Sequence, residues 1–456
     1  MRLPELTASP AMLGALSAAD WWTLLTGVVC AVACGVAGCY LVLRRMSLLG
    51  DAISHAVLPG LGVAFILTGT RDPLAMLAGA AGAGVATAGL SAGLSRVGRI
   101  AEDAALGVVF TVLFALGVIL LSFLPSDLHL DASCVLYGNL EFVALDTVRV
   151  LGVDAPRVLV PLGAVLVVVA GAVAVGFKEL GIVAFDPALA RSMGIPAGVI
   201  HAAMLALVAA ATVVSFEAVG SVLVVAMLIA PCATARLITD RLGWTYGLSG
   251  LLAASAAGVG YAVAAAMDAP VAGMISVVAG VQFALAAVMA PSHGMAARAV
   301  TRLGLALRIT REDILGMLFR WDERRSDAEG MAGRAVPPLR AADVTAAIGS
   351  PWTARLALWG LHRRGMIERA PDGTIRPTEA GRASGASVVR THRLWEAYLA
   401  RHLGLPLDHL HAASHRAEHF IPADLEAQVR AEVGDPVADP HGRPIPPARS
   451  GPAGLA

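Results

Sequence analysis

The sequence predicts an all-α polytopic membrane bundle of eight to ten transmembrane helices, followed by a smaller polar region. The chain is 57% hydrophobic and 15% charged, whereas soluble proteins carry about 25% charged residues. The charge is also uneven: residues 1–300 hold 13 Lys/Arg and 16 Asp/Glu, and the last 156 residues hold 21 and 18. Apolar segments of about 20 residues, the length that crosses a bilayer, recur through the first part only.

Nine apolar segments are predicted to be spanning helices, and the basic residues between them set their orientation. Lys and Arg gather in alternate loops, which places the N-terminus outside and the polar region in the cytoplasm. The segment from Trp21 is long enough to be a first span and has no basic leader before it. Residues 133–150 are left open as a re-entrant or surface helix. The predicted spans are residues 21–43, 48–68, 73–95, 103–124, 158–177, 197–215, 218–237, 244–266 and 270–290.

Composition gives little further information on function. The net charge is zero, so nothing in the overall balance favours nucleic acid or anionic lipid. The cysteines form no CxxC pair and are expected to be buried structural residues. Residues 78–93 are mostly Ala and Gly, and small residues let membrane helices pack closely.

Residues 46–60 place two ionisable side chains in an apolar segment. Asp51 and His55 lie four residues apart, on one face of a helix, and Pro59 with Gly60 is expected to kink or loosen it. Ionisable groups in a membrane helix are costly and indicate function; alternatively, Asp51 caps the helix and His55 bonds to backbone. Glu217 is a second candidate, with a water-facing interfacial carboxylate as its alternative.

The loop 177–197 contains a predicted short amphipathic helix. Phe185, Leu189 and Met193 recur at helical spacing, and Asp186 followed by Pro187 is typical of an N-cap with proline at the first helical position. This helix is either a docking site for a cytoplasmic partner or an ordinary loop helix.

The polar region is predicted to contain helices and one hairpin. Asp372 and Gly373 are expected at the hairpin turn. The expected order is a helix over 311–325, a loop over 326–338, helices over 340–348 and 351–364, a hairpin over 366–377, helices over 378–402 and 423–433, and an extended or disordered end over 436–452.

Eight of the twelve histidines lie in this polar region. His392 and Glu396 are spaced i, i+4; His411, His415, Glu418 and His419 share one face of the next helix, and Asp313 lies on the first helix. Imidazole and carboxylate groups at one-turn spacing converge on a common centre. Such a set without thiolate favours Mn²⁺, Fe²⁺ or Zn²⁺ over Cu(I).

The polar region resembles the diphtheria-toxin-repressor family of metal-dependent regulators. The resemblance rests on THRLWEAYLARHLGL (391–405), HLHAASHRAEH (409–419) and GDPVADPHGRPIP (434–446). It implies a winged helix-turn-helix over 301–385, a helical metal-binding and dimerisation domain over 386–446, and a disordered tail over 447–456. By position it implies one site of His392, Glu396 and His411, and another of Asp313, His415, Glu418 and His419. The family often has Cys or Glu in place of His415, so the metal stays open.

DNA binding by this region is an alternative that the sequence does not favour. The expected recognition helix offers Ser350, Thr353 and Arg355 to base edges, while Trp352 and Trp359 are bulky and apolar. We expect a metal-sensing or docking domain instead.

The first 300 residues resemble the permeases of metal-ion ABC importers of the zinc and manganese type. The resemblance covers residues 20–295 and rests on MSLLGDAISHAVLPG (46–60), LYGN (136–139), DPALARSMGIP (186–196) and AVGSVLVVAMLIAPCATARL (218–237). It implies a homodimeric permease of the bacterial plasma membrane that receives metal from an extracytoplasmic lipoprotein. The chain has no GxxxxGK[ST] phosphate loop, so the ATPase is expected on a separate cytoplasmic chain and this chain is not an enzyme. The resemblance makes 185–196 a coupling helix, with Phe185, Asp186, Leu189, Arg191 and Gly194 as its residues.

The sequence therefore predicts an importer subunit for a divalent transition metal, Mn²⁺ first and Zn²⁺ or Fe²⁺ next, with a cytoplasmic metal-sensing domain. Asp51, His55 and Glu217 are the expected ligands along the transport path. The alternative is a membrane-anchored, metal-responsive transcription regulator. A permease for metal chelates is disfavoured, because a chelate brings its own ligands.

Overall fold

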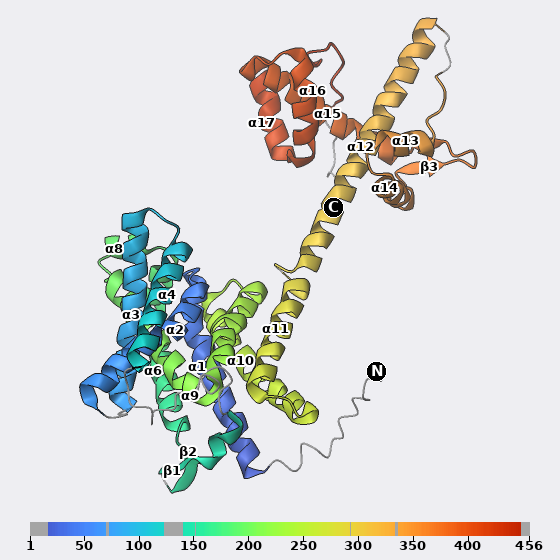
Figure 1. The fold of residues 1–456 in the computed structure, drawn as a ribbon. Helices are drawn as coiled ribbons and strands as arrows, with labels where there is room; N and C mark the ends of the chain where they lie inside the picture. The colour runs from blue at the N-terminus through green and yellow to red at the C-terminus, as the bar shows by residue number, and fades with distance from the viewer. Residues whose placement is uncertain are drawn as a thin grey trace. The chain divides into compact units, whose positions relative to one another are not determined.

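The computed structural model describes residues 17–69, 73–122, 140–150, 152–291, 293–332 and 336–447. The chain divides into two compact units, Met1–Ala297 and Arg298–Ala456 (Figure 1).

The first unit is a helical bundle in which every predicted span is a helix. The predicted spans 197–215 and 218–237 form one element, α9, which is broken at Gly220, where φ is 75° and ψ is 171°. The helices are α1 (Ala18–Leu43), α2 (Ser47–Thr68), α3 (Pro73–Gly98), α4 (Glu102–Ser122), α6 (Leu159–Val175), α7 (Phe177–Phe185), α8 (Pro187–Ser192), α9 (Ala197–Ile238), α10 (Leu242–Met267) and α11 (Val271–Met289).

Helix α1 lies inside this bundle. It packs against α9 and α10, and it begins at a capping box in which the Ser17 hydroxyl accepts from the backbone of Asp20. Alanine and cysteine line its buried face, including Cys30, Cys34 and Ala37. A Cβ added at Gly38 would lie 1.8 Å from the carbonyl oxygen of Leu228, so only glycine allows α1 and α9 to approach this closely. The described cysteines are buried and free, as predicted.

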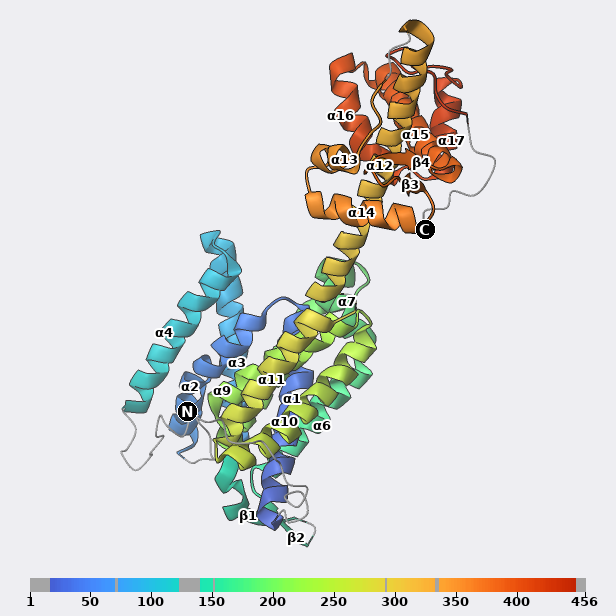
Figure 2. The ribbon, with the colours of Figure 1, turned by 90° about the vertical axis from the view of Figure 1, so that its right-hand side faces the viewer.

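Helices α2, α3 and α4 pack against one another on one side of the unit (Figure 2). Helix α2 continues through Pro59, and the kink or loosening expected there stays a prediction. The residue after Pro59 has to be glycine, because a Cβ on Gly60 would lie 2.3 Å from the carbonyl oxygen of Gly79 in α3. Gly117 of α4 meets Pro59 in the same way, at 2.7 Å from its Cδ.

Six described helical segments are long and apolar enough to cross a membrane, or seven if α6 and α7, bent by 79°, form one span. The sequence predicted eight to ten spans. The two remaining predicted segments are the helices α2 and α3. Among the described residues, helix α2 contributes a shorter apolar stretch, Leu58–Thr68. Helix α3 is rich in Ala and Gly.

The stretch before α6 differs from the expectation of a re-entrant or surface helix over 133–150. A 3₁₀-helix, η2 (Leu140–Leu145), is followed by an antiparallel hairpin of β1 (Thr147–Val150) and β2 (Val153–Pro156), in which Thr147 pairs with Pro156. Alternating β-branched residues around Gly152 favour strands here. The LYGN motif (136–139) lies outside the described residues.

At the other end of the unit α8 forms as predicted (Figure 1). The Asp186 carboxylate accepts hydrogen bonds from the backbone of Ala188 and Leu189, both at 2.9 Å, and Pro187 opens the helix. The side chains of Phe185, Leu189 and Met193 are at least half exposed.

The second unit begins with most of the long helix α12 (Met295–Ala332). The prediction of a loop from residue 326 is wrong up to Ala332. An i, i+4 ion pair between Arg325 and Glu329 at 2.9 Å supports the helix here despite Gly330. The other elements follow the predicted order: α13 (Ala341–Ala347), α14 (Pro351–Arg363), β3 (Ile367–Arg369), β4 (Ile375–Pro377), α15 (Glu379–Leu403), α16 (Leu407–Ala417), η3 (Glu418–Phe420) and α17 (Ala423–Val433).

Helices α12, α13 and α14 and the β3–β4 hairpin share one core. Ile314, Leu315 and Leu318 of α12 pack with Val344 of α13 and Leu361 of α14. Two helices followed by an antiparallel hairpin have the element order of a winged helix. Gly373 makes the hairpin turn with φ 83°, as Asp372-Gly373 predicted.

The end of the unit is an ordered loop over its described residues, whereas an extended or disordered end was predicted from 436. Arg393 donates to the carbonyl of Pro444 at 2.6 Å, and Arg390 donates to that of Pro446 at 2.6 Å. These two buried arginines hold the loop on α15. Residues 448–456 lie outside the described residues.

Candidate metal centre

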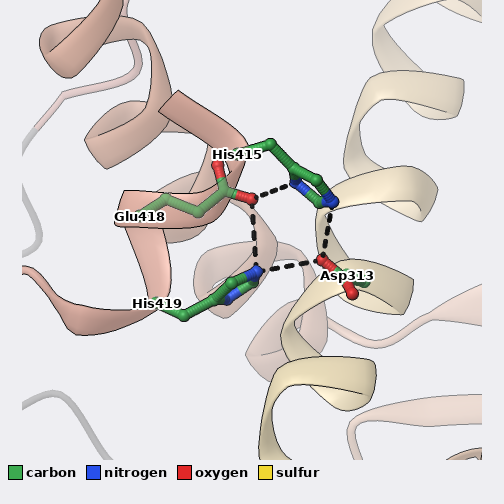
Figure 3. Close-up of side chains that lie close together, drawn as sticks. All are labelled: Asp313, His415, Glu418 and His419. Carbon is green, nitrogen blue, oxygen red and sulfur yellow. Dashed lines mark hydrogen bonds and ion pairs between the residues drawn. The ribbon is translucent and has the colours of Figure 1, made fainter. Parts of the chain in front are cut away.

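Four of the predicted ligands come together between α12 and the end of α16 (Figure 3). Asp313 Oδ1 lies 3.2 Å from His419 Nε2 and 3.8 Å from His415 Nε2. Glu418 Oε1 lies 2.8 Å from His415 Nδ1 and 3.6 Å from His419 Nε2. One ligand atom from each residue lies within 4.8 Å of the others, as a single cation requires.

Local structure explains why these side chains converge. His415, Glu418 and His419 are spaced i, i+3 and i+4 across the junction of α16 and η3, so they share one face. Their partner Asp313 is brought from a remote part of the chain by α12. Glu312, its neighbour, lies 2.7 Å from His419 Nδ1 and so directs the other ring nitrogen into the centre. Carboxylates commonly orient a metal-binding histidine in this way.

Two buried atoms in this group have no hydrogen-bond partner among the described residues. They are Asp313 Oδ1 and His419 Nε2, and they face each other. Buried polar atoms almost always have a partner, and a divalent cation would supply one to both. Two imidazoles and two carboxylates suit Mn²⁺, Fe²⁺ or Zn²⁺.

The second predicted group also converges, on the neighbouring side of α15. His392 Nε2 lies 3.0 Å from Glu396 Oε1 and 3.0 Å from His411 Nδ1, and His411 Nδ1 lies 3.3 Å from the same carboxylate oxygen. His392 and Glu396 are buried, whereas His411 is exposed and gives the group access to solvent.

Glu418 connects the two groups. Its Oε1 faces His415, and its Oε2 lies 2.5 Å from Nδ1 of His392. The buried Glu418 carboxylate therefore contacts a ligand of each group. A shift of this carboxylate in one group would change its contact with the other.

Electrostatics in the metal-free groups favour protonated histidines beside ionised carboxylates. Burial lowers the pKa of His419, but the carboxylates of Asp313 and Glu312 beside the imidazole outweigh it and raise the pKa to about 9. Burial likewise lowers the pKa of His392, and Glu396 and Glu418 raise it above its ordinary value. A metal ion would take the place of these protons.

Sequence reasoning missed two contributors. Glu312 is one. The other is His441, whose Nδ1 lies 3.7 Å from Glu396 Oε2, so that Glu396, Asp439 and His441 form a third group of potential ligands. Asp439 fixes the loop, since its Oδ1 accepts from the backbone of His441 at 2.9 Å and of Arg443 at 2.8 Å. The PHG string of the quoted motif was the available signal, but its nearness to Glu396 depends on tertiary structure.

The predicted transport-path residues lie on helices that pack together, α2 for Asp51 and His55 and α9 for Glu217. The structure does not describe the side chains of His55 and Glu217. Asp51 is half-buried and follows Gly50, which contacts Leu228 of α9. Leu228 lies ten residues before the end of α9 at Ile238, or about 15 Å along a helix. Asp51 therefore lies at the depth of Leu228, inside the helical bundle and away from the end of α9.

The first unit matches known transporters over most of its length. Residues 20–290 match the family described as ABC 3 transport family. The chain belongs to the ABC 3 transport family. Among its relatives are the manganese transport system membrane protein MntD of Bacillus subtilis, 43% identical over 62% of this chain and 96% of that protein, and the zinc transport system membrane protein TroD of Treponema pallidum, 37% identical over 76% and 92%.

A solved structure of this ABC 3 type supports the same assignment. PsaBC from Streptococcus pneumoniae in complex with Fab is 31% identical, with a TM-score of 0.51 over 60% of this chain and 92% of that chain. Family membership and the apolar helices make this chain a multi-pass membrane permease, as the sequence predicted.

All the candidate metal ligands of the second unit except Asp313 lie in a second matching region. Residues 378–447 match the iron dependent repressor, metal binding and dimerisation domain. This confirms the predicted combination of an ABC permease with a repressor-like metal domain in one chain. Asp313 and Glu312 lie before the matched residues, so α12 completes the first group from outside this domain.

Proposed function

We propose that this chain is the membrane subunit of an ATP-driven importer of a divalent transition metal, and that its C-terminal unit senses the same metal in the cytoplasm. The observation that carries the proposal is a buried set of carboxylate and imidazole ligands joined in one chain to an ABC 3 permease. Mn²⁺ is the first candidate, with Zn²⁺ and Fe²⁺ next, since the relatives are named for manganese and zinc.

In this proposal Asp51, His55 and Glu217 are ligands along the path. Carboxylate and imidazole groups on two packed helices offer a transient site, and few protein ligands allow the metal to be released. The site would be doubled in a homodimer. Metal would arrive from an extracytoplasmic binding lipoprotein at the plasma membrane.

A separate cytoplasmic ATPase would drive the cycle through α8. The capped helix presents Leu189 and Arg191 between the exposed Phe185 and the turn at Gly194, where φ is 79°. An exposed, rigid helix with apolar side chains is suited to docking in a partner's groove.

The C-terminal unit would reduce transport when cytoplasmic metal is plentiful. Its ligands are Asp313, His415, Glu418 and His419 in one group and His392, Glu396 and His411 in the other. Occupancy would neutralise several buried charges at once and so change how the unit pairs or docks.

The test is uptake of radioactive manganese in cells that carry a His392/Glu396/His411 triple alanine variant. We expect wild-type uptake to fall after loading with internal manganese, and uptake by the variant to stay high. A His409→Ala variant is the matched control, because His409 is an exposed histidine on α16 outside the groups. Unchanged feedback in the triple variant would refute sensing, and absence of manganese, zinc or iron uptake by the wild type would refute transport and favour an anchored regulator.

A further inference from the structure

The outer face of α14 carries a continuous stripe of exposed side chains. The stripe residues follow at i, i+3, i+4, i+7, i+10 and i+11, which is one face of a helix. The opposite face, with Ala354, Ala357 and Leu361, is buried in the core of the unit. The exposed stripe consists of Trp352, Arg355, Leu356, Trp359, His362 and Arg363.

The middle of the stripe is apolar. Trp352 is 54% exposed, Leu356 42% and Trp359 58%. Large apolar side chains grouped on one exposed face mark an interaction surface. The guanidinium of Arg363 lies 4.9 Å from the centre of the Trp359 ring, so a positive charge and an aromatic ring form one combined surface.

The charge on this helix has a single sign. Residues 351–364 contain Arg355, Arg363 and Arg364 and no Asp or Glu. These three arginines take part in none of the ion pairs found among the described residues, whereas Arg382, Arg390 and Arg393 nearby in sequence are all paired. A partner for this face therefore has to be both anionic and able to accept apolar side chains.

We propose that this face of α14 docks on the surface of an anionic lipid bilayer. Trp352, Leu356 and Trp359 would insert at headgroup depth, where tryptophan rings are favoured, and Arg355 and Arg363 would contact lipid phosphates. The unit is covalently joined to a membrane permease, so a bilayer is always present at high effective concentration.

The face fits a bilayer better than it fits DNA, although α14 occupies the place of a recognition helix. A major-groove helix reads base edges with hydrogen-bonding side chains such as Arg, Asn and Gln. Two indole rings and a leucine at the centre of the face offer almost none of these. The stripe also contains none of the proposed metal ligands.

Tryptophan quenching in nanodiscs tests this proposal with the full-length protein. The discs contain equal parts of phosphatidylglycerol and phosphatidylcholine brominated in the upper acyl chains. We expect Trp352→Phe/Trp359→Phe to remove part of the lipid-quenched emission. Trp395→Phe is the control, because Trp395 stacks on Tyr398 with ring centres 5.1 Å apart inside its own cluster, and its loss should leave the quenched emission unchanged.

The arginines separate lipid recognition from the other outcomes. Arg355→Gln and Arg363→Gln should each lower the ratio of lipid-docked to undocked C-terminal units, read from the quenched emission, about fivefold in the anionic discs. Both changes should have little effect in discs of phosphatidylcholine alone. An unchanged quenched component in the double tryptophan variant overturns the proposal. So does a response of these tryptophans to added duplex DNA in place of lipid, or docking that is indifferent to both arginines.

Discussion

The two regions with proposed metal ligands differ in how many of these ligands lie together among the described residues. In the membrane unit, Asp51 lies on a helix whose neighbours are mostly Ala, Gly and Leu. In the C-terminal unit, carboxylates and imidazoles from α12, α15, α16 and η3 lie within ion-pair distance of one another. A transport site has to release its ion in every cycle, whereas a sensor has to retain it long enough to change conformation. Sparse and dense ligand sets are what these two tasks require.

The largest expected effect follows from changing Asp51, one of the few proposed ligands along the transport path. Asp51→Asn keeps the shape of the side chain but removes the charge, and with so few ligands nothing compensates. Changes in groups that merely orient ligands already cost 10–100-fold, so we expect uptake of manganese to fall by at least about a hundredfold. The measurement is the initial rate of uptake in metal-depleted cells, normalised to the amount of protein in the membrane.

The same assay separates the regions when it is applied to His419→Ala. Initial uptake by this variant should stay within about twofold of the wild type, because metal-depleted cells leave the sensor empty. If Asp51→Asn and His419→Ala lowered uptake equally, the division of tasks would be wrong.

A smaller effect is expected from pH, which should change the metal affinity of the ligand groups in the C-terminal unit. The raised pKa of His419, about 9, means that an incoming cation displaces a proton at neutral pH. Metal affinity of the C-terminal unit should therefore rise with pH up to about 9, by at most tenfold per unit for one proton. Titration of the purified full-length protein with Mn²⁺ from pH 6 to pH 9 measures this. His419→Gln should flatten the slope and His409→Gln should leave it intact.

Stability of the metal-free protein should show the opposite sign. Because the folded-state pKa of His419 is raised, its protonated form stabilises the fold fully below the unfolded pKa near 6.5, and this contribution is lost as pH rises through about 9. The melting temperature of the C-terminal unit without metal should fall over this interval, and saturating metal should remove the fall. A melting temperature that rose with pH in the absence of metal would contradict the assigned ion pairs.

The smallest expected effect lies at α8. Asp186→Ala removes both hydrogen bonds of the N-cap, which costs about 1 kcal/mol of local helix stability. If α8 couples ATP hydrolysis to transport, Asp186→Ala should lower metal-stimulated ATP hydrolysis by the reconstituted complex about fivefold. Asp186→Ser keeps a capping hydroxyl and should restore most of the activity. Equal loss in both variants would indicate that the carboxylate acts on the partner and not as a cap.

Much of the fold was predictable because its signals are local. Apolar segments, the cap at Asp186 and the turn at Asp372-Gly373 depend on neighbours in the sequence. The misses depend on packing. The loop predicted from residue 326 is wrong because α12 extends past residue 325 with support from an ion pair, whereas the kink or loosening expected at Pro59 stays a prediction. The break in α9 falls at Gly220, where only glycine readily adopts a positive φ, a few residues from the predicted boundary.

The candidate metal groups show the same division. His415, Glu418 and His419 were identifiable from one-turn spacing alone. Glu312 and His441 were not, because their distances to His419 and Glu396 are set by how remote segments fold together. Sequence spacing finds ligands that share a helix, and the residues that orient or extend them need the tertiary structure.

The contact between Gly60 and Gly79 has a kinematic consequence. The backbones of α2 and α3 approach so closely at this pair that no side chain fits between them, and a Cβ on Gly117 of α4 would likewise meet Pro59. We therefore expect α2, α3 and α4 to move as one block that carries Asp51. We expect any motion that opens the permease to one side and then to the other to shift this block against α1 and α9.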